Sequence, residues 1–547
     1  MVIYEVKNLS FAYSDEEENV LQDINIKINS GDFVLLCGKS GSGKSTLLSQ
    51  LKKETVKKGL KSGKVLFCNE DIENTDDYNS VSQIGFCAQD PSLQQICETV
   101  ESELRFILSN LESDSINLKI AETVSFFGIE SLYHKKISEL SGGERQIINI
   151  AAALVTEPKV LLLDEPFSQL DLYSSERLSN LLKKMNNELG VTIVIAEHSL
   201  EKVLEFCTSV IYLKDKKASE FSVSNFIESG HLMDFGVIPY EVYNFITEQK
   251  QKKAPVTVSQ CKKIIEKYNI CYNSPQPVNE NSDNICELKK VFFRYTKNSA
   301  DVLKGLNLSV KKREVLSVLG CNGSGKTTLI SLINGVNKPF SGKVKINSDI
   351  KISVLPQDPA LLFSFDTVVQ ILNNCIRAFG YKDLFKEMND LHPEKNIKPC
   401  AEVKNITEQL NITDILYRNP FDLSVGQQQI TAFAYIMLCD PDLIILDEPT
   451  KGIDKQRKDI LIDFIVRMKQ LNKTVIIVTH DIDFAAEVSD RCALLFDGKI
   501  VADENTDLFL KNSRNYTSAV NQIFSSVEMY KRPISLREVR QCTAELK

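Results

Sequence analysis

A glycine-rich pattern occurs twice in this chain, and it constrains the fold more than any other feature. Residues 38–46 read GKSGSGKST, and residues 320–328 read GCNGSGKTT. Both fit G-x-x-x-x-G-K-[ST], and each lies between a short apolar run and a helix-compatible run. A loop that opens a helix in this way directs backbone N–H groups toward an anion. The sequence therefore predicts two phosphate-binding domains of the same α/β fold class.

The similarity between the two halves extends beyond these loops. LSFAYSDEEENVLQDINIKI before the first loop aligns with VFFRYTKNSADVLKGLNLSV before the second, with Tyr13 and Tyr295 at equivalent positions. Apolar runs also recur in pairs: VLLLDE (160–165) with LIILDE (443–448), and VTIVIAEH (191–198) with TVIIVTH (474–480). Because these runs are short, continuous and rich in Val, Ile and Leu, they predict buried, largely parallel strands.

Length and composition place limits on the domain organisation. A chain of 547 residues is too long for one hydrophobic core. We expect a first domain at 1–228, a linker with one or two short helices at 229–285, a second domain at 286–510 and a C-terminal tail at 511–547. No apolar stretch of about 18 residues and no signal peptide are found. The net charge of −8 argues against a general nucleic-acid binder.

Each half offers the residues that hold a metal-bound nucleotide. A loop lysine can reach the β- and γ-phosphates, the hydroxyl beside it can bind Mg²⁺, and an aspartate at the end of a later strand can hold the same ion. These residues are Lys44, Ser45 and Asp164 in the first half, and Lys326, Thr327 and Asp447 in the second.

A second carboxylate follows each aspartate. Glu165 and Glu448 are predicted to polarise a water molecule for attack on the γ-phosphate, a role that contributes about 10²–10⁴ in rate. The competing interpretation is that each strand-end carboxylate only caps the next helix. The phosphate loop upstream favours the catalytic interpretation.

Histidine and glutamine also recur at equivalent positions. His198 and His480 follow the next strand, and we predict that they contact the γ-phosphate or align the water. Gln89 and Gln357, in AQDP and PQDP, could bridge Mg²⁺ and the attacking water. Taken singly, such residues are more often structural or exposed.

The segments LSGGERQ (140–146) and LSVGQQQ (423–429) each precede a helical run. Their serine and glycine N–H groups would lie at a helix start and face an anion. Each half already has a complete phosphate loop. This second anion-binding element is therefore predicted to meet a nucleotide that another domain holds.

Together, these ordered motifs resemble the ABC ATPase family. The resemblance implies two tandem P-loop NTPase domains, each with a mainly parallel sheet core, an antiparallel β subdomain and a helical subdomain. It also implies a head-to-tail sandwich that uses ATP and Mg²⁺, in which each ATP lies between the phosphate loop of one half and the signature segment of another. The halves would pair with each other or with a second chain.

The resemblance implies a role for each matched position. Tyr13 and Tyr295 match the aromatic residue that stacks on adenine, and 168–171 and 451–454 match a loop that couples the two sites. One ATP would contact Tyr13, Gly38, Lys39, Ser40, Gly41, Ser42, Gly43, Lys44, Ser45 and Thr46, with Ser424 and Gly426. The other would contact Tyr295, Gly320, Cys321, Asn322, Gly323, Ser324, Gly325, Lys326, Thr327 and Thr328, with Ser141 and Gly143. Mg²⁺ would be held by Ser45, Gln89 and Asp164, and by Thr327, Gln357 and Asp447.

One position departs from the family pattern. Val425 stands where the signature has its first glycine. If that position requires a positive φ, a β-branched residue is strained there. This leads to the hypothesis of two chemically complete but unequal sites, the Lys44 site being the slower.

Within the family, several stretches look like the fused ATPase subunit of energy-coupling factor (ECF) transporters. They are RNPFDLSVGQQQ (418–429), DEPTKGID (447–454), HDIDFAAEVSDRCALLFDGKIVAD (480–503) and MDFGVIPY (233–240). The resemblance implies a peripheral ATPase on the cytoplasmic face of the cell membrane. Its partners would be a transmembrane coupling subunit and a small substrate-binding membrane protein, and its cargo a vitamin, a vitamin precursor or a transition-metal ion. We expect the coupling surface at about 90–139 and 358–422.

Other interpretations remain open because the motifs are shared. A twin ABC ATPase acting on ribosomes or translation would have the same catalytic residues, as would the fused ATPase of a sugar importer. A binding module without activity is the remaining class, and it would lack glutamates or histidines that this chain retains. No nucleic-acid partner is expected.

Overall fold

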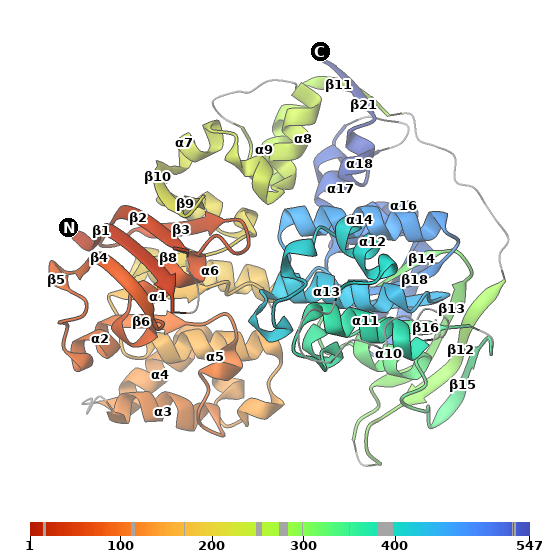
Figure 1. Ribbon diagram of the computed structural model, residues 1–547, viewed down its shortest axis with the longest axis horizontal. Coiled ribbons are helices and arrows are strands. Elements are labelled where there is room, and N and C mark those ends of the chain that lie inside the picture. The colour runs from red at the N-terminus through yellow and green to blue at the C-terminus, as the bar shows by residue number, and fades with distance from the viewer. Residues whose placement is uncertain are drawn as a thin grey trace. The chain divides into compact units, whose positions relative to one another are not determined.

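A computed structural model describes most of the chain (Figure 1). The described residues are 1–547 without 15–17, 111–114, 169, 248–253, 273–282, 298, 349, 380–397, 528, 530–531 and 547. The chain divides into two units, of which the first comprises Met1–Asn244 and Glu248–Cys261, and the second Phe245–Thr247 and Lys262–Lys547.

The first unit contains two sheets. The antiparallel sheet has the order β2-β1-β4-β5, and the larger sheet has the order β10-β9-β3-β8-β7-β6. In the larger sheet β10 pairs antiparallel with β9 at one edge, and the other neighbours are parallel. The strands are β1 (Val2–Tyr13), β2 (Leu21–Asn29), β3 (Phe33–Gly38), β4 (Gly59–Phe67), β5 (Glu70–Asp71), β6 (Ile84–Cys87), β7 (Val160–Asp164), β8 (Thr192–Ala196), β9 (Ser209–Lys214) and β10 (Lys217–Ser222).

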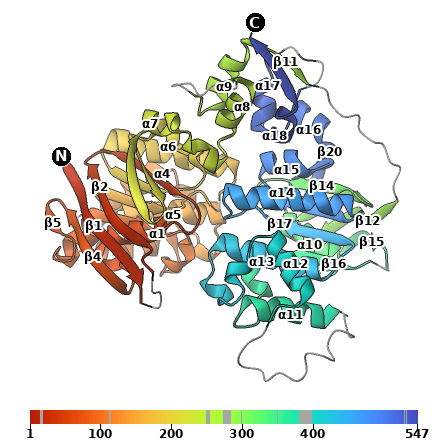
Figure 2. The same ribbon diagram turned by 45° about the horizontal axis from the view of Figure 1, so that its top comes forward.

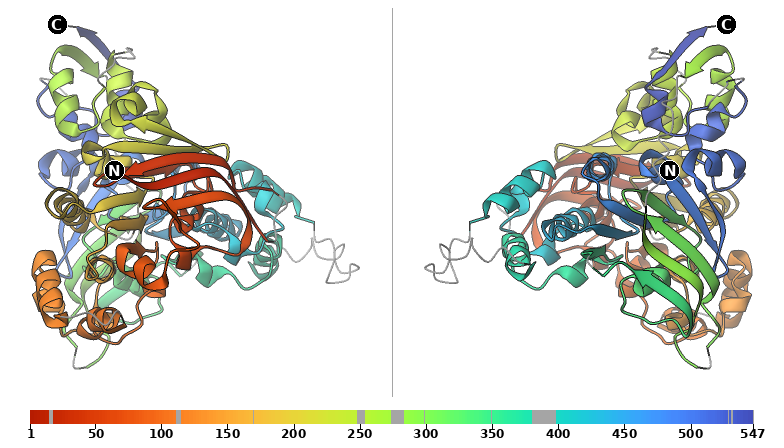
Figure 3. Two further views of the ribbon diagram at one scale, coloured as in Figure 1. Left: turned by 90° about the vertical axis from the view of Figure 1, so that its left-hand side faces the viewer. Right: turned by 90° about the vertical axis from the view of Figure 1, so that its right-hand side faces the viewer.

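The second unit repeats this arrangement. Its antiparallel sheet has the order β13-β12-β15, and its larger sheet has the order β16-β17-β18-β14-β19-β20, with the antiparallel strand again at the edge. The strands are β12 (Asn284–Phe293), β13 (Leu303–Lys311), β14 (Val315–Leu319), β15 (Ser341–Ile346), β16 (Ile352–Leu355), β17 (Leu443–Asp447), β18 (Thr474–Thr479), β19 (Arg491–Phe496) and β20 (Lys499–Asn505). Figure 3 shows the curved antiparallel sheets in red for the first unit and in green for the second. The predicted fold class is confirmed.

The apolar runs in the sequence form the centre of each large sheet. Every residue of β7, β8, β17 and β18 is buried. Helices and the antiparallel sheet cover the faces of such parallel strands, which explains why the strands lack an alternating polar pattern. The antiparallel strands do alternate: β2 is buried at every second position over most of its length.

Helices complete each unit. In the first unit α3, α4 and α5 pack together, as Figure 1 shows. In the second unit α11, α12 and α13 do the same (Figure 2), around a core that includes Val403 and Phe433. The first unit contains α1 (Lys44–Gln50), α2 (Asp77–Gln83), α3 (Val100–Asn110), α4 (Ile116–Phe127), α5 (Gly142–Leu154), α6 (Leu172–Leu189) and α7 (Val223–Glu228). The second contains α10 (Lys326–Ile333), α11 (Val368–Phe379), α12 (Ala401–Gln409), α13 (Val425–Leu438), α14 (Lys455–Gln470), α15 (Ile482–Val488) and α16 (Thr506–Asn512).

The expected linker and tail both contain regular structure. The segment 229–285 forms α8 (Ile238–Thr247), α9 (Val258–Ile265) and β11 (Tyr268–Tyr272). Residues 511–547 form α17 (Ala519–Phe524), α18 (Leu536–Val539) and β21 (Cys542–Leu546), and β21 pairs antiparallel with β11. The domain boundaries drawn from the sequence stay a prediction, and part of the linker lies outside the described residues. Within the described part of the chain, none of the helices combines the length and apolarity that a membrane crossing needs.

Candidate nucleotide-binding sites

Strand order brings the predicted site residues together in each unit. In the first unit the neighbouring strands β3, β8, β7 and β6 lead into the phosphate loop, His198, Asp164 with Glu165, and Gln89 respectively. The second unit uses β14, β18, β17 and β16 in the same way. Because these strands are parallel, their carboxyl ends meet at one edge of the sheet, which is where ligands bind in such folds.

The two phosphate loops have almost the same backbone. Gly41 and Gly323 have φ values of 79° and 78°, and Gly43 and Gly325 have values of 98° and 104°. These left-handed conformations favour glycine. A Cβ added at Gly41 or Gly323 would meet no atom within 4 Å, so the loop surface is open at that point.

The loop lysines are buried and hold the loops closed. Lys44 Nζ donates to the carbonyl oxygens of Gly38 at 3.0 Å and Lys39 at 3.3 Å. Lys326 Nζ donates to Gly320 at 2.9 Å and Cys321 at 3.1 Å. Both ammonium groups therefore lie against the loop that is predicted to bind phosphate.

A hydroxyl and a carboxylate lie together in each unit, as Mg²⁺ binding requires. Ser45 Oγ donates to Asp164 Oδ1 at 3.0 Å, and Thr327 Oγ1 donates to Asp447 Oδ2 at 3.2 Å. Burial is the main reason why the pKa of each aspartate is raised to about 6. Oxygen ligands of this kind suit Mg²⁺, which keeps several waters and takes few protein ligands.

Each phosphate loop also contains a buried hydroxyl that lacks a partner among the described residues. These atoms are Ser42 Oγ and Ser324 Oγ, at equivalent positions in the two loops. A buried polar atom without a partner costs free energy, so a native example needs a reason. A nucleotide phosphate in the loop would supply the missing partner, and the residues present therefore fit ATP with Mg²⁺.

Both predicted catalytic glutamates have a left-handed backbone. Glu165 has φ 44° and Glu448 has φ 50°. The amide N–H of each donates to the neighbouring strand, at Ala196 O (2.9 Å) and Val478 O (2.8 Å). Positive φ in a residue other than glycine is uncommon and gathers at functional sites. The turn bends the chain directly after the aspartate, so that both carboxylates stay at the sheet edge.

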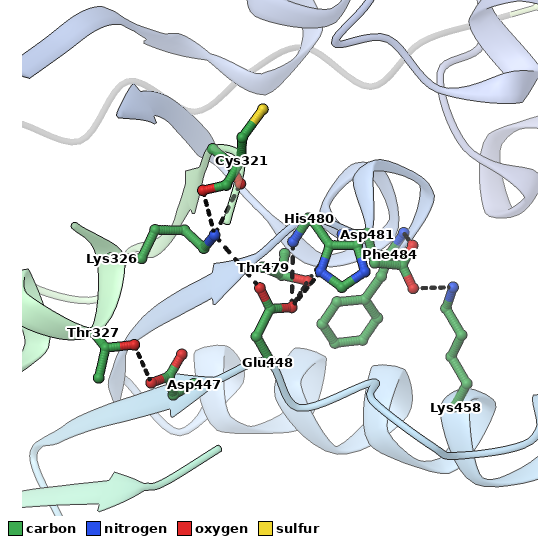
Figure 4. A network of polar contacts seen from close by, with 11 residues as sticks. Cys321, Lys326, Thr327, Asp447, Glu448, Lys458, Thr479, His480, Asp481 and Phe484 are labelled. Atoms are coloured by element: carbon green, nitrogen blue, oxygen red, sulfur yellow. Dashed lines mark hydrogen bonds and ion pairs between the residues drawn. The ribbon is translucent and has the colours of Figure 1, made fainter. Parts of the chain in front are cut away.

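Glu448 lies at the centre of a polar network in the second unit (Figure 4). Its Oε2 is 2.8 Å from His480 Nδ1 and accepts hydrogen bonds from the His480 amide and the Thr479 hydroxyl, both at 3.3 Å. Its Oε1 is 3.7 Å from Lys326 Nζ. Burial favours the protonated acid, but His480 and Lys326 outweigh burial and lower the pKa of Glu448.

Glu165 has different partners in the first unit. Its Oε2 accepts a hydrogen bond from Gln89 Nε2 at 2.8 Å and lies 3.7 Å from His198 Nδ1. Burial again opposes ionisation, but His198 and Lys44 together lower the pKa of Glu165. The equivalent of Gln89 in the second unit, Gln357, is exposed and lies two residues beyond the end of β16.

Sequence reasoning missed Glu197. This residue is fully buried, lies 3.8 Å from His198 Nδ1, and accepts hydrogen bonds from the amides of Phe167 and His198. Burial raises the pKa of its carboxyl group. The signal in the sequence was the dipeptide Glu-His, which the second half replaces with Thr479 and His480.

The predicted adenine-stacking tyrosines are anchored to the phosphate loops. The hydroxyl of Tyr13 lies 2.7 Å from Thr46 Oγ1, and that of Tyr295 lies 2.9 Å from Thr328 Oγ1. In the first unit Lys57 Nζ also lies 5.7 Å from the centroid of the Tyr13 ring. Sequence reasoning did not identify Lys57, because a lysine in a polar stretch carries no distinctive signal.

The signature segments start helices, as the sequence predicts. Ser141 and Ser424 are the N-cap residues of α5 and α13, and each forms a capping box with the third helical residue, Glu144 or Gln427. Val425 is the first residue of α13, and neither it nor its equivalent Gly142 has a positive φ. The proposed backbone strain at Val425 is therefore wrong, because a β-branched residue fits helical dihedral angles.

Other predicted residues are placed without a test of their role. Gly143 and Gly426 are buried in the first turn of α5 and α13. Ser40 and Asn322 lie in the phosphate loops. The loop 451–454, which is predicted to couple the two sites, is described, whereas in 168–171 residue 169 lies outside the described residues.

Known proteins share this organisation. The family model for the ABC transporter matches residues 21–168 and 303–451, which together span more than half of the chain. A putative ABC transporter ATP-binding protein of Bacillus thuringiensis subsp. konkukian is 35% identical, with 95% of this chain and 94% of that protein covered. Another, from Methanosarcina mazei, is 29% identical over 91% of this chain and 88% of its own length.

A solved structure has the same fold. An archaeal ribosome recycling factor, in complex with the archaeal ribosomal stalk protein, aligns with a TM-score of 0.57 at 20% identity, covering 92% of this chain and 90% of that chain. At this identity the likeness is one of fold alone. The family match, by contrast, covers the phosphate loop, the signature segment and the Asp-Glu pair of each half, whereas His198 and His480 lie outside the matched residues. This chain belongs to the ABC transporter family of ATP-binding proteins and carries the family's ATP-binding domain twice.

Proposed function

We propose that this chain binds and hydrolyses ATP at two sites, and that hydrolysis energises a membrane transporter of the ECF uptake type. The cargo would be a vitamin, a vitamin precursor or a transition-metal ion. The observation that carries the ATPase proposal is the duplicated cluster of lysine, hydroxyl, aspartate, glutamate and histidine at the carboxyl edge of each sheet.

The chemistry would divide among these residues. Loop N–H groups and Lys326 would bind the β- and γ-phosphates, while Thr327 and Asp447 would hold Mg²⁺, which neutralises developing charge. Glu448, ionised because its pKa is lowered, would accept a proton from the attacking water on its carboxylate. His480 would hold that carboxylate in place and contact the γ-phosphate. Lys44, Ser45, Asp164, Glu165 and His198 would act in the same way in the first unit.

We further propose that each ATP is completed by a signature segment. The helix starts at Ser141 and Ser424 present N–H groups that suit a phosphate. Ser424 and Gly426 would complete the site of Lys44, and Ser141 and Gly143 the site of Lys326. The partner segment would come from the other half or from a second chain.

Exposed apolar side chains after the two glutamines support a membrane partner. Leu93 and Leu361, at equivalent positions, are 80% and 75% exposed, and Ile96 and Phe365 lie nearby in sequence and are also exposed. Tyr417 and Phe421 add two exposed aromatic rings in the second unit, and Phe106 adds one in the first. Exposed apolar residues that gather in one segment mark interaction sites. They fall within the segments expected to form the coupling surface.

Co-purification from gently solubilised cells would test the transporter proposal. A stoichiometric multi-span membrane protein bound to the tagged full-length chain is the expected result. Leu361→Glu with Phe365→Glu should release it and leave the ATP turnover of the isolated chain intact. The matched control replaces Leu189 and Leu471, which are exposed at equivalent helix ends, with glutamate and should retain the partner. Ribosomal subunits without a membrane protein would support the ribosome-acting alternative instead.

A further inference from the structure

Two positions differ between the halves in opposite ways, since each has glycine in one half and a larger residue in the other. In the signature segment, Gly142 of the first half corresponds to Val425 of the second. In the loop after the catalytic glutamate, Gln169 of the first half corresponds to Gly452 of the second. Each half therefore has one glycine and one larger residue, but at opposite positions.

In the second unit these two positions touch. A Cβ added to Gly452 would lie 2.8 Å from Val425 Cγ1 and 3.4 Å from Val425 Cβ. Protein atoms do not approach a Cβ as closely as the shorter distance, so the side chain of Val425 fills the space that a side chain at 452 would need. Gly452 also has φ 69°, which independently favours glycine.

The backbone of the same loop packs against the next helical residue. A Cβ added at Gly426 would lie 3.2 Å from Gly452 O and 3.4 Å from the Arg457 side chain. The first turn of α13 and the loop before α14 therefore fit together closely at two successive residues. Such tight packing means that an added methyl group must displace either the loop or the helix start.

We propose that Val425 and Gly452 are a matched pair, in which the valine side chain holds the loop 451–454 against the start of α13. Val425 is thus a positioning residue that replaces the missing side chain of the loop. It is not a defect of the signature. In the first half the corresponding residues are Gly142 and Gln169, of which residue 169 lies outside the described residues.

The contact links two functional elements of one unit. Ser424, the cap of α13, belongs to the segment proposed to complete the Lys44 site. The loop begins just after Glu448, and the Lys451 amide donates to Glu448 O at 3.1 Å. This proposal rests on the proposed ATPase function. The side chain of Val425 would then couple the geometry of one ATP site to the glutamate of the other.

A double-mutant cycle on the full chain tests the pair. Gly452→Ala should lower the melting temperature and reduce ATP turnover about tenfold with KM little changed, because the methyl group collides with Val425. Val425→Gly should cause a smaller loss of turnover because the loop loses its support. The double variant should recover most of the turnover lost in Gly452→Ala. Gly452→Ala and the double variant both carry the backbone strain of alanine at positive φ, so this strain cancels in the cycle.

Losses that simply add in the second-unit cycle would overturn the matched pair. So would a Val425→Gly variant that turns over faster than the wild type, which would mean that the valine impairs its site.

Failure of the proposed function can be told apart from failure of this inference. The melting temperatures of the four proteins in the second-unit cycle measure the contact without any ATP. Non-additive melting temperatures with no ATPase activity in the wild type would refute the proposed catalytic function but support the matched pair. An active wild type with additive melting temperatures and additive rates would refute the matched pair but support the proposed catalytic function.

Discussion

The two glutamate clusters use the same residue types but connect them differently. In the second unit His480 Nδ1 lies 2.8 Å from Glu448 Oε2, within one close pair. In the first unit His198 Nδ1 lies between two carboxylates, 3.7 Å from Glu165 and 3.8 Å from Glu197. A repeated motif therefore does not guarantee a repeated network.

One position accounts for much of this difference. The first unit has Glu197 where the second has Thr479, and the threonine hydroxyl donates to Glu448 at 3.3 Å. A threonine adds no charge at this position, and the second carboxylate near His480 is that of Asp481, which is paired with Lys458 at 2.6 Å. Burial favours the neutral form of His198, but Glu165 and Glu197 together outweigh it and raise the pKa of His198. We therefore predict that His198 stays a cation to higher pH than an unperturbed histidine does.

The largest effect should come from removing the glutamates. Glu165→Gln with Glu448→Gln should lower steady-state ATP turnover by about 10²-fold or more, because both proposed bases are lost. Of the single variants, Glu448→Gln should cost more, since Glu448 is already paired with its histidine whereas Glu165 is bonded to Gln89. Equal losses from the two single variants would count against unequal sites.

Metal binding should depend on pH in the same way at both sites. Asp164 and Asp447 must lose a proton to bind Mg²⁺, and both have a pKa of about 6. Affinity for Mg²⁺ with ATP should thus be constant well above pH 6 and should fall about tenfold per unit below it. Calorimetric titration across this range measures the effect. An affinity for Mg²⁺ that does not change with pH would contradict this prediction. In Asp164→Asn, only the site of Asp447 should still show the pH dependence.

Replacing Glu197 should make the first network more like the second. Glu197→Thr removes one of the two carboxylates around His198, so the pKa of His198 should fall. Nuclear magnetic resonance of ¹³C-labelled histidine can follow this titration in a chain with five histidines. Glu201→Gln, at an exposed residue nearby, is the control and should change nothing. An unchanged midpoint in Glu197→Thr would mean that Glu197 does not act on His198.

The smallest effect concerns a feature that the two units share. Tyr13→Phe and Tyr295→Phe each remove one hydroxyl contact with a loop threonine and should each cost about 1 kcal/mol of unfolding free energy. Because the rings remain, ATP affinity should be retained. Thermal unfolding would measure the change, with the exposed Tyr173→Phe as the control. Clearly different costs would show that the two loops are anchored unequally.

Much of the fold was predictable because its signals are local. Continuous apolar runs at 160–165 and 443–448 predict buried strands, and glycine patterns predict loops that open helices. The segment 511–547 gave no such signal, yet its described part forms α17, α18 and β21. Strand β21 depends on β11, more than two hundred residues earlier, and such long-range pairing leaves no local pattern in either strand.

The site residues also divide into those that the sequence identified and those that it did not. Asp164 and Glu165 were identifiable because each has a counterpart in the other half at a strand end. Glu197 and Lys57 were missed because neither has one, so repetition could not draw attention to them. The strain proposed for Val425 was wrong because its backbone φ depends on where α13 starts, which the sequence pattern alone does not state.

By itself, the amino-acid sequence determined that two ABC-type domains form and which residues meet at each sheet edge, since each motif follows a buried parallel strand and the carboxyl ends of parallel strands share one edge. Only the tertiary structure decided which partner each glutamate has, how far each histidine lies from it, and that Val425 fits against Gly452. These outcomes depend on distances of a few tenths of an ångström between residues far apart in the chain. Packing and burial set such distances, and no local pattern encodes them.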